Sequence, residues 1–416
     1  MEQKKREDGI VIVLGVVLAY LVYSVVMNQL PQTLADFNGH TYVYLPMLTQ
    51  DSWVEGWKAV PYCMWHLCVL ALNRLLRIPL EASAAYVSCF FYLLAYWLMY
   101  WMIQKYMTAK SKALCSAKAG AIAFGLSVVQ ALYFYWLDTG ARFLGTFSMN
   151  PIHSPTHICV RPFVLLCFCL VYDIWGRQKD ENYHGVFFPV ENGLKRYYIY
   201  LTVALLLSAM AKPVFAEMFI PAVALIMLVE WIARIIKKDG SAGNYFRQCL
   251  SMLYCSIPTL IYILVQFLAY FIFEGSYGAD GSLVLTRWLE VWKMYSENIT
   301  LSVLLGMAFP LYMILIDGRF FFKSDMGRLA LAGYGAGFLE AAMLGEGGSK
   351  LGSGDFLWPM MCGMQLMWVV STLRLVELEG NQADTKTKRF LLNLAWALFC
   401  LHVLCGLLYI KEILGT

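Results

Sequence analysis

The sequence predicts an all-α protein that crosses a membrane about eleven times and forms a single domain over residues 1–416. Three observations predict this class. Hydrophobic residues make up 60% of the chain and charged residues only 14%, with a mean hydropathy of +0.59. Apolar runs long enough to cross about 30 Å of hydrocarbon recur along the chain. The polar segments between them, at roughly 20–30 residues, are too short to fold alone.

The first apolar run, Ile10 to Met27, is expected to remain as a transmembrane helix. It follows a basic start, Met1 to Arg6, and lacks the small-residue cleavage site of a removed signal peptide. The other runs of sufficient length begin near residues 82, 119, 158, 197, 214, 248, 299, 328, 356 and 390.

A further run, Pro61–Ile78, is ambiguous because its apolar residues fall mainly on one face. If it does not cross and the N-terminus is cytoplasmic, most of the 32 Lys and Arg residues lie inside, as the positive-inside rule requires. If it crossed, that bias would be reversed. We therefore predict an amphipathic helix at the outer interface, within a first outer loop over residues 29–81. The aromatic residues expected to anchor it are Trp53, Trp57, Tyr62 and Trp65.

The twelve cysteines are interpreted as small membrane hydrophobes. Most lie in apolar runs, such as Cys167 and Cys169, and no Cys or Cys/His cluster has the spacing of a zinc site. No Walker A sequence, dinucleotide fingerprint or repeat is present. We therefore expect no metal, no cofactor and no nucleic-acid partner.

A polar loop directly after the first span, Asp36-Phe37-Asn38-Gly39-His40, gives the strongest functional signal. Charged groups at the mouth of a membrane protein are costly and usually functional. We predict Asp36 as the catalytic residue. The predicted topology brings further polar residues to the same side, and the candidate substrate-binding residues are His40, His66, Asp138, Arg142, His157, Arg161, Lys212, Glu217 and Lys350.

Lys212 and Arg161 are the best placed of these to meet an anionic lipid headgroup. Lys212 lies between two apolar spans, Arg161 lies near the outer membrane boundary, and each precedes a proline. Lys and Arg are natural phosphate partners, although snorkelling to ordinary phospholipids is an alternative for both. His66 is equally consistent with an interfacial residue. Lys350 lies in a Gly-rich stretch, Gly345 to Asp355, that is also typical of a flexible connector.

This set of residues suits transfer of a sugar from a polyprenyl-phosphate carrier to a glycan or lipid acceptor at the outer face. A carboxylate beside an acceptor hydroxyl can act as general base, and nearby cations stabilise a departing phosphate. Nucleotide donors are absent outside the membrane, so a lipid-linked sugar is the sensible donor. The predicted partners are therefore this donor, the acceptor and membrane lipids.

The chain resembles the GT-C membrane glycosyltransferases in layout. In the stretch Tyr62 to Ala82, an apolar helix and a short turn lead into an Ala-rich second span. The stretch Asn150-Pro-Ile-His-Ser-Pro-Thr-His157, leading into Arg161-Pro-Phe163, is similar to bacterial surface-polysaccharide members. The resemblance implies an enzyme of the bacterial cytoplasmic membrane and matches Asp36 to the first-loop catalytic acid.

The resemblance has a departure that concerns metal binding. Members often carry a second acid close to the first, whereas this chain offers Asn38 and His40 after Asp36. One carboxylate and one imidazole make a poor site for Mg²⁺ or Mn²⁺, so a divalent cation is only weakly supported.

Three other functions remain open. A transporter or flippase of a lipid-linked saccharide would show repeats and polar residues at the membrane midplane, and neither is evident. A polysaccharide polymerase or ligase would share the donor and the outer-face site. A scaffold subunit of a polysaccharide export complex would need no catalytic residue.

Overall fold

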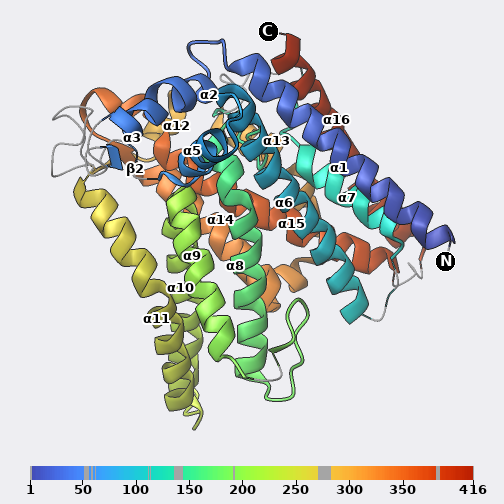
Figure 1. Ribbon diagram of the computed structural model, residues 1–416. Coiled ribbons are helices and arrows are strands. Elements are labelled where there is room, and N and C mark those ends of the chain that lie inside the picture. The colour runs from blue at the N-terminus through green and yellow to red at the C-terminus, as the bar shows by residue number, and fades with distance from the viewer. Residues whose placement is uncertain are drawn as a thin grey trace.

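Long apolar helices dominate the computed structural model of the chain (Figure 1). The structure describes residues 2–50, 56–57, 60, 62–110, 112, 114–134, 144–190, 193–269, 283–380 and 385–415. Within these ranges, eight helices are long and apolar enough to cross a membrane, which confirms an all-α multi-pass membrane protein. They are α1 (Glu2–Gln29), α6 (Leu80–Ala109), α8 (Pro155–Lys179), α10 (Val214–Ile236), α11 (Ala242–Phe267), α13 (Ile299–Lys323), α15 (Trp358–Gly380) and α16 (Lys386–Gly415).

The three remaining predicted spans are also helices, but they are shorter or less apolar. They are α7 (Ser116–Val128), α9 (Lys195–Ala211) and α14 (Asp325–Met343). With 13 residues, α7 covers only about 20 Å, less than the roughly 30 Å of a hydrocarbon core. The predicted count of eleven crossings therefore stays a prediction, although every predicted run coincides with a helix.

Shorter elements gather at one end of α8, α9, α10 and α11, at the upper left of Figure 1. The chain that follows α1 folds back over this end, and two short strands pair antiparallel, with Leu283 opposite Glu346. The elements are α2 (Asp36–Asn38), η1 (Gly39–Tyr44), α3 (Leu45–Gln50), α5 (Met64–Leu76), β1 (Leu283–Leu285), α12 (Glu290–Lys293), β2 (Leu344–Glu346), η4 (Gly348–Ser353) and η5 (Asp355–Leu357). The Gly-rich stretch therefore contains regular turns.

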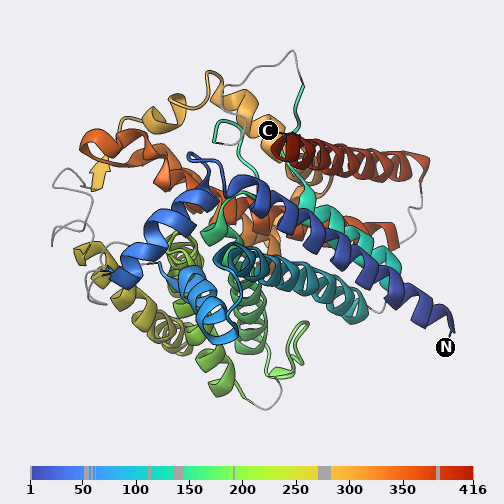
Figure 2. The ribbon, with the colours of Figure 1, turned by 45° about the horizontal axis from the view of Figure 1, so that its top comes forward.

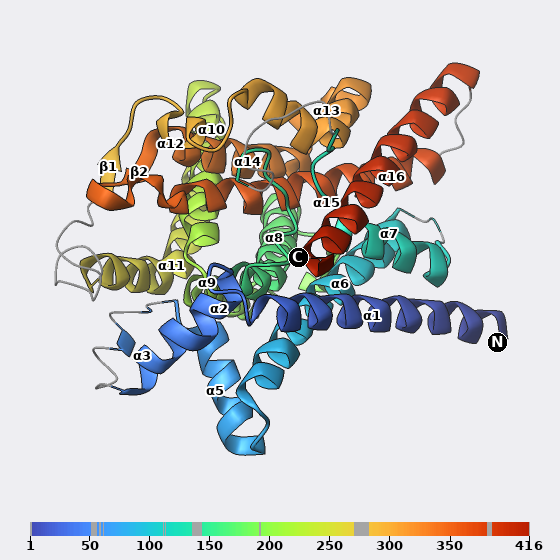
Figure 3. The same cartoon turned by 90° about the horizontal axis from the view of Figure 1, so that it is seen from above.

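The ambiguous run Pro61–Ile78 forms α5, which at 13 residues is too short to cross. One side of α5 is buried and the other is exposed, since Trp65 is fully buried while Leu75 is 80% exposed. It packs against α6, α8 and α9, and it projects from the edge of the bundle in the view of Figure 3. The predicted headgroup anchoring by Trp65 is wrong, because its indole N–H donates to Ser88 Oγ (3.1 Å) in the interior.

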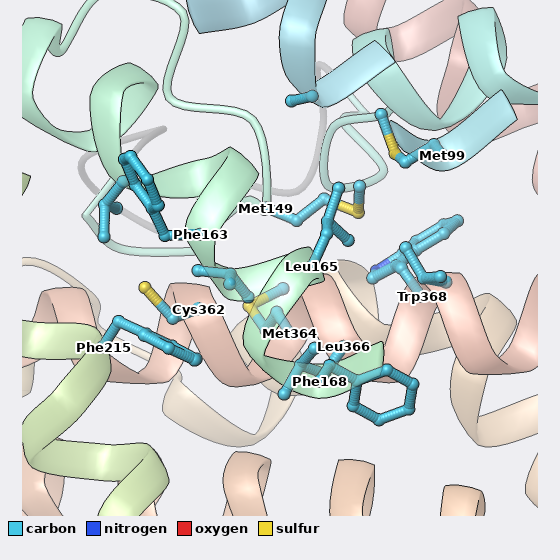
Figure 4. Close-up of a cluster of buried hydrophobic side chains, with 14 of the residues drawn as sticks. Met99, Met149, Phe163, Leu165, Phe168, Phe215, Cys362, Met364, Leu366 and Trp368 are labelled. Atoms are coloured by element: carbon cyan, nitrogen blue, oxygen red, sulfur yellow. The ribbon is translucent and has the colours of Figure 1, made fainter. Parts of the chain in front are cut away.

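The helices α8 and α15 form the centre of the bundle. Of their apolar parts, 89% and 94% are buried inside the protein, against 28% for α10 and α11. Figure 4 shows Phe163 and Phe168 of α8 beside Cys362 and Leu366 of α15. The helices α14 and α15 approach closely, since a Cβ added at Gly363 would lie 2.6 Å from a backbone atom of α14. The lipid-facing surface is therefore left to the outer helices, including α10 and α11.

The first helix closes the other side of the bundle. It lies along α6 and α7, as Figure 2 shows, and it also contacts α16. Tyr96 of α6 donates to the carbonyl of Val11 (3.0 Å), and Asn28 donates to the carbonyl of Ile413 (2.6 Å). These bonds join the two ends of the chain within one bundle.

Helix ends that the basic-residue distribution assigns to the cytoplasm lie together and carry ion pairs. Glu230 Oε1 at the end of α10 is 3.3 Å from Lys179 Nζ and 2.5 Å from Arg328 Nη1. Lys118 Nζ of α7 lies 2.8 Å from Glu379 Oε1 of α15. Several of the charged groups at these helix ends are therefore matched with opposite charges.

A buried carboxylate organises the segment after α8. Asp173 is fully buried and accepts a hydrogen bond from the hydroxyl of Tyr183 (2.6 Å). It also accepts three backbone N–H groups, from Val186 (2.8 Å), Phe187 (2.8 Å) and Phe188 (2.7 Å). The Asp173 carboxylate thus accepts backbone N–H groups of residues 186–188, which would otherwise be paired within a helix or strand.

We predict that Asp173→Ala lowers the midpoint of thermal unfolding, measured on the purified protein in detergent. The change leaves the backbone donors without an acceptor, with a loss on the order of 3 kcal/mol. Asp180→Ala is the matched control, because its exposed carboxylate accepts one N–H group, from Asn182. Equal midpoints for the two variants would contradict this role of Asp173.

If α5 lies at the outer interface, as the sequence predicts, a cysteine at Arg77 should react with a membrane-impermeant maleimide added to intact cells. Arg77 is exposed at the end of α5. Native Cys115, exposed at the start of α7, is the reference for the opposite side and should react only after permeabilisation. The Arg77→Cys variant is therefore labelled in a Cys115→Ser background. Labelling of Arg77→Cys only after permeabilisation would overturn the predicted topology.

Candidate functional site

Lys212 lies at the centre of the polar residues at the end of the bundle that the sequence predicts to face outward. It lies between α9 and Pro213, in an extended conformation (φ −167°, ψ 121°) that separates α9 from α10. Its Nζ lies 3.7 Å from the centroid of the Trp358 ring. Burial lowers the pKa of Lys212, and the negative charges of Asp355 and Asp36 oppose this shift. Within the described residues its ammonium group has a π-face partner but no carboxylate at ion-pair distance.

Arg161 and His157 lie one turn apart on α8, so they share a face of the helix. Both are fully buried, and the Arg161 guanidinium carbon lies 4.8 Å from the Tyr92 ring. Within the described part of the chain, all three guanidinium nitrogens and both imidazole nitrogens lack a hydrogen-bond partner. The His157 ring also packs 5.3 Å from that of Trp358. Buried donors without partners are costly, and an anion would satisfy them.

His40 and His66 form a buried pair, with 3.0 Å between Nδ1 of His40 and Nε2 of His66. Burial lowers the pKa of His40, as do the charges of His66 and Lys212, and burial lowers the pKa of His66 to about 3. Both rings are therefore neutral at pH 7, so one donates while the other accepts. The pair can orient a neighbour or pass a proton, but it supplies no positive charge. His66 is buried, so its interpretation as an interfacial residue is wrong.

Asp36 begins α2 and lies within electrostatic range of Lys212, Asp355 and His153. The residues beside it fix the loop. Phe37 is fully buried against Trp65, with the two ring centroids 6.2 Å apart. The Asn38 amide donates to the carbonyl of Leu30 (2.6 Å). The loop therefore holds the Asp36 carboxylate beside the cation of Lys212.

A cavity of about 480 Å³ opens beside Lys212. Its walls come from α10, α11, α14, β1, β2 and η5, and they combine apolar side chains with ionisable ones. The lining includes one ammonium group, that of Lys212, and the carboxyl groups of Glu217, Glu340, Glu346 and Asp355. Burial and the charge of Asp355 raise the pKa of Glu346 to about 7, while Lys350 opposes the shift.

The structure brings most of the predicted site residues to one place. The charge of Lys212 reaches Asp36, Glu217, His40 and His157. Asp138 and Arg142 lie outside the described residues. Their predicted substrate-binding roles therefore stay predictions.

Lys350 lies beside the cavity, where its charge reaches Glu346 and Asp355. Both acids belong to the Gly-rich stretch that is also typical of a flexible connector, and both line the cavity. Trp358 was not a candidate at all, although an aromatic residue before a proline at the start of a span was a usable signal.

No group of three His, Cys, Asp or Glu side chains in the described part of the chain is arranged to hold a metal ion. The cavity carboxylates lie on four separate elements. What the arrangement offers instead is a pair of cations on one side and several carboxylates on the other.

These features define a multi-pass membrane protein with a charged cavity at one end of its bundle. No protein-family model matches the sequence, and no curated protein matches it either. Membership of the GT-C glycosyltransferases therefore stays a prediction.

The unpartnered cations predict that a lipid phosphate binds at Arg161. Dodecyl phosphate should raise the unfolding midpoint of the purified protein, and dodecanol should not. Binding at 100-fold above Kd stabilises by about 2.7 kcal/mol. Arg161→Gln should lose this shift, whereas Arg74→Gln, a change at an exposed residue of α5, should keep it. An undiminished shift in Arg161→Gln would show that the phosphate binds elsewhere.

Proposed function

We propose that this protein is a membrane glycosyltransferase of the bacterial cytoplasmic membrane. In this proposal it moves a sugar from a polyprenyl-phosphate donor to a hydroxyl group of a glycan or lipid acceptor at the outer face. The observation that carries the proposal is the buried, unpartnered guanidinium of Arg161 close to Lys212, with the carboxylate of Asp36 nearby. The cations of Arg161 and Lys212 can stabilise a leaving phosphate. The carboxylate of Asp36 can accept the proton of an attacking hydroxyl group.

Arg161 and Lys212 both lie within electrostatic range of His157 and Cys362. In the proposed reaction, the bond between the anomeric carbon and the phosphate oxygen breaks, and its electron pair leaves with the phosphate. The cations stabilise the charge that develops there. The acceptor oxygen forms the new bond to the anomeric carbon, and its proton passes to Asp36. No further reactant is needed for this step.

The lipid-facing side of the bundle supports a carrier with a long apolar chain. An apolar groove of about 350 Å³ runs between α10 and α11, and its lining includes Ile220, Trp231 and Phe246. The outer ends of the same two helices contribute Val214, Ile263 and other residues to the cavity. A lipid with its phosphate at Lys212 thus has apolar surface available along both helices.

Asp36→Asn is the decisive test, in proteoliposomes supplied with a polyprenyl-phosphate sugar and an acceptor glycolipid. Loss of a general base is expected to lower the rate of product formation by about 10²–10⁴-fold. Asp239→Asn, a change at an exposed residue outside the site, is the matched control. Phosphate-dependent stabilisation of Asp36→Asn shows that the variant is folded and still binds the headgroup.

Glycosylation that persists in Asp36→Asn would contradict the catalytic assignment. The same proteoliposomes separate the rival functions. Movement of the labelled donor across the bilayer without transfer would favour a flippase, and products with many added sugars would favour a polymerase.

A further inference from the structure

The described lining of the cavity beside Lys212 is richer in carboxyl groups than in cationic groups. Four carboxylates line it, from Glu217, Glu340, Glu346 and Asp355. Within the described residues, none of them has a cationic group at ion-pair distance, and the ammonium of Lys212 rests on the Trp358 ring. Glu377, by contrast, lies 2.8 Å from the guanidinium of Arg374.

Glu346 is the most enclosed of the four and is directed to the cavity. It is only 5% exposed, because β2 is paired with β1 and followed by η4. In the described part of the structure, its Oε2 has no hydrogen-bond partner. A buried carboxylate oxygen in this state needs a proton or a cationic donor from a ligand.

The spacing of the carboxylates favours an organic cation over a metal ion. Among the described residues, no three acidic, histidine or cysteine side chains converge closely enough to coordinate a metal. An ammonium group has three donors, so it can be held by separate carboxylates around a larger space. It also places a positive charge among the carboxyl groups that line the described part of the cavity.

We propose that the cavity recognises a donor sugar that carries a free amino group, with the ammonium at Glu346 and the carrier phosphate at Lys212 and Arg161. This inference rests on the glycosyltransferase function proposed above and names its substrate class. A neutral sugar can donate hydroxyl hydrogens to the carboxylates, but it leaves their charge unbalanced. A uronic acid adds another negative charge to the same cavity and is disfavoured.

The affinity for such a sugar should depend on pH. Glu346 faces Asp355, which raises its pKa, and Lys350, which lowers it, while Glu217 and Glu340 lie across the same cavity. The pKa of Glu346 is about 7, so a proton competes with the ammonium below that value. Affinity for an amino sugar should therefore rise between pH 6 and pH 7, whereas affinity for a uronic acid should fall.

The experiment compares three synthetic donors with the same polyprenyl-phosphate chain, linked to glucosamine, glucose or glucuronic acid. Their equilibrium binding to the protein in nanodiscs is measured at pH 7.5 without acceptor. We expect the glucosamine donor to bind about tenfold tighter than the glucose donor, the effect of one charge-assisted hydrogen bond. The glucuronic acid donor should bind weakest. Equal binding of the glucosamine and glucose donors, or tightest binding of the glucuronic acid donor, would overturn the inference.

Glu346→Gln keeps the side-chain shape and should reduce the preference for glucosamine over glucose to about threefold or less. Glu297→Gln, a change at an exposed residue outside the cavity, should leave the preference unchanged. If Glu346→Gln does not elute as a single folded species, Glu340→Gln replaces it with the same expectation.

Binding and transfer fail in distinguishable ways. Binding of glucosamine donor in the predicted order, without transfer to any acceptor, would overturn the glycosyltransferase function and keep the recognition of the amine. Transfer with a reversed binding order would overturn only the inference about the amine. Absence of binding by all three donors would overturn both.

Discussion

A buried charge inside a membrane protein must meet an opposite charge, a π face or a ligand, because lipid supplies none of these. The position of Arg161 depends on this constraint. Its helix, α8, is enclosed on all sides, and the guanidinium rests on the Tyr92 ring. The ammonium group of Lys212 likewise lies over the ring of Trp358. The loop after α1, the break between α9 and α10 and the start of α15 all converge here. This end of the bundle is therefore built around two cations that the described residues compensate only partly.

The two ends of the bundle treat charge differently. At the predicted inner end, the Arg374 guanidinium forms ion pairs with two carboxylates, those of Asp317 and Glu377. Asp317 lies at the point where α13 is kinked. Such paired charges need no ligand to explain them. At the other end, the described carboxyl groups of the cavity and the ammonium of Lys212 lie near one another without an ion pair among them. Unpaired, perturbed groups beside a cavity are typical of functional sites, whereas closed ion pairs are typical of structural ones.

Hydropathy and the distribution of basic residues were enough to predict the class of fold, the helices and the non-crossing nature of α5. They also placed His40, His157, Arg161 and Lys212 on one side of the membrane. Side-chain partners were beyond this approach, because a one-dimensional pattern does not specify which helix faces meet. Trp65 therefore resembled an interfacial anchor although it packs inside. The glycines around Glu346 and Asp355 are typical of a flexible connector, so the sequence did not show that the pairing of β1 with β2 helps to enclose Glu346.

The poor enclosure of α10 and α11 has a consequence for how any lipid-linked ligand meets the cavity. Only 28% of the apolar part of each helix is covered by protein, and the outer ends of both help to line the cavity. A ligand can therefore arrive by lateral diffusion in the plane of the bilayer, with its tail never leaving lipid. Occupancy then follows the mole fraction of the ligand among the surrounding lipids and not its amount per volume of solution. Dilution with inert lipid would empty the cavity, whereas dilution with buffer would not.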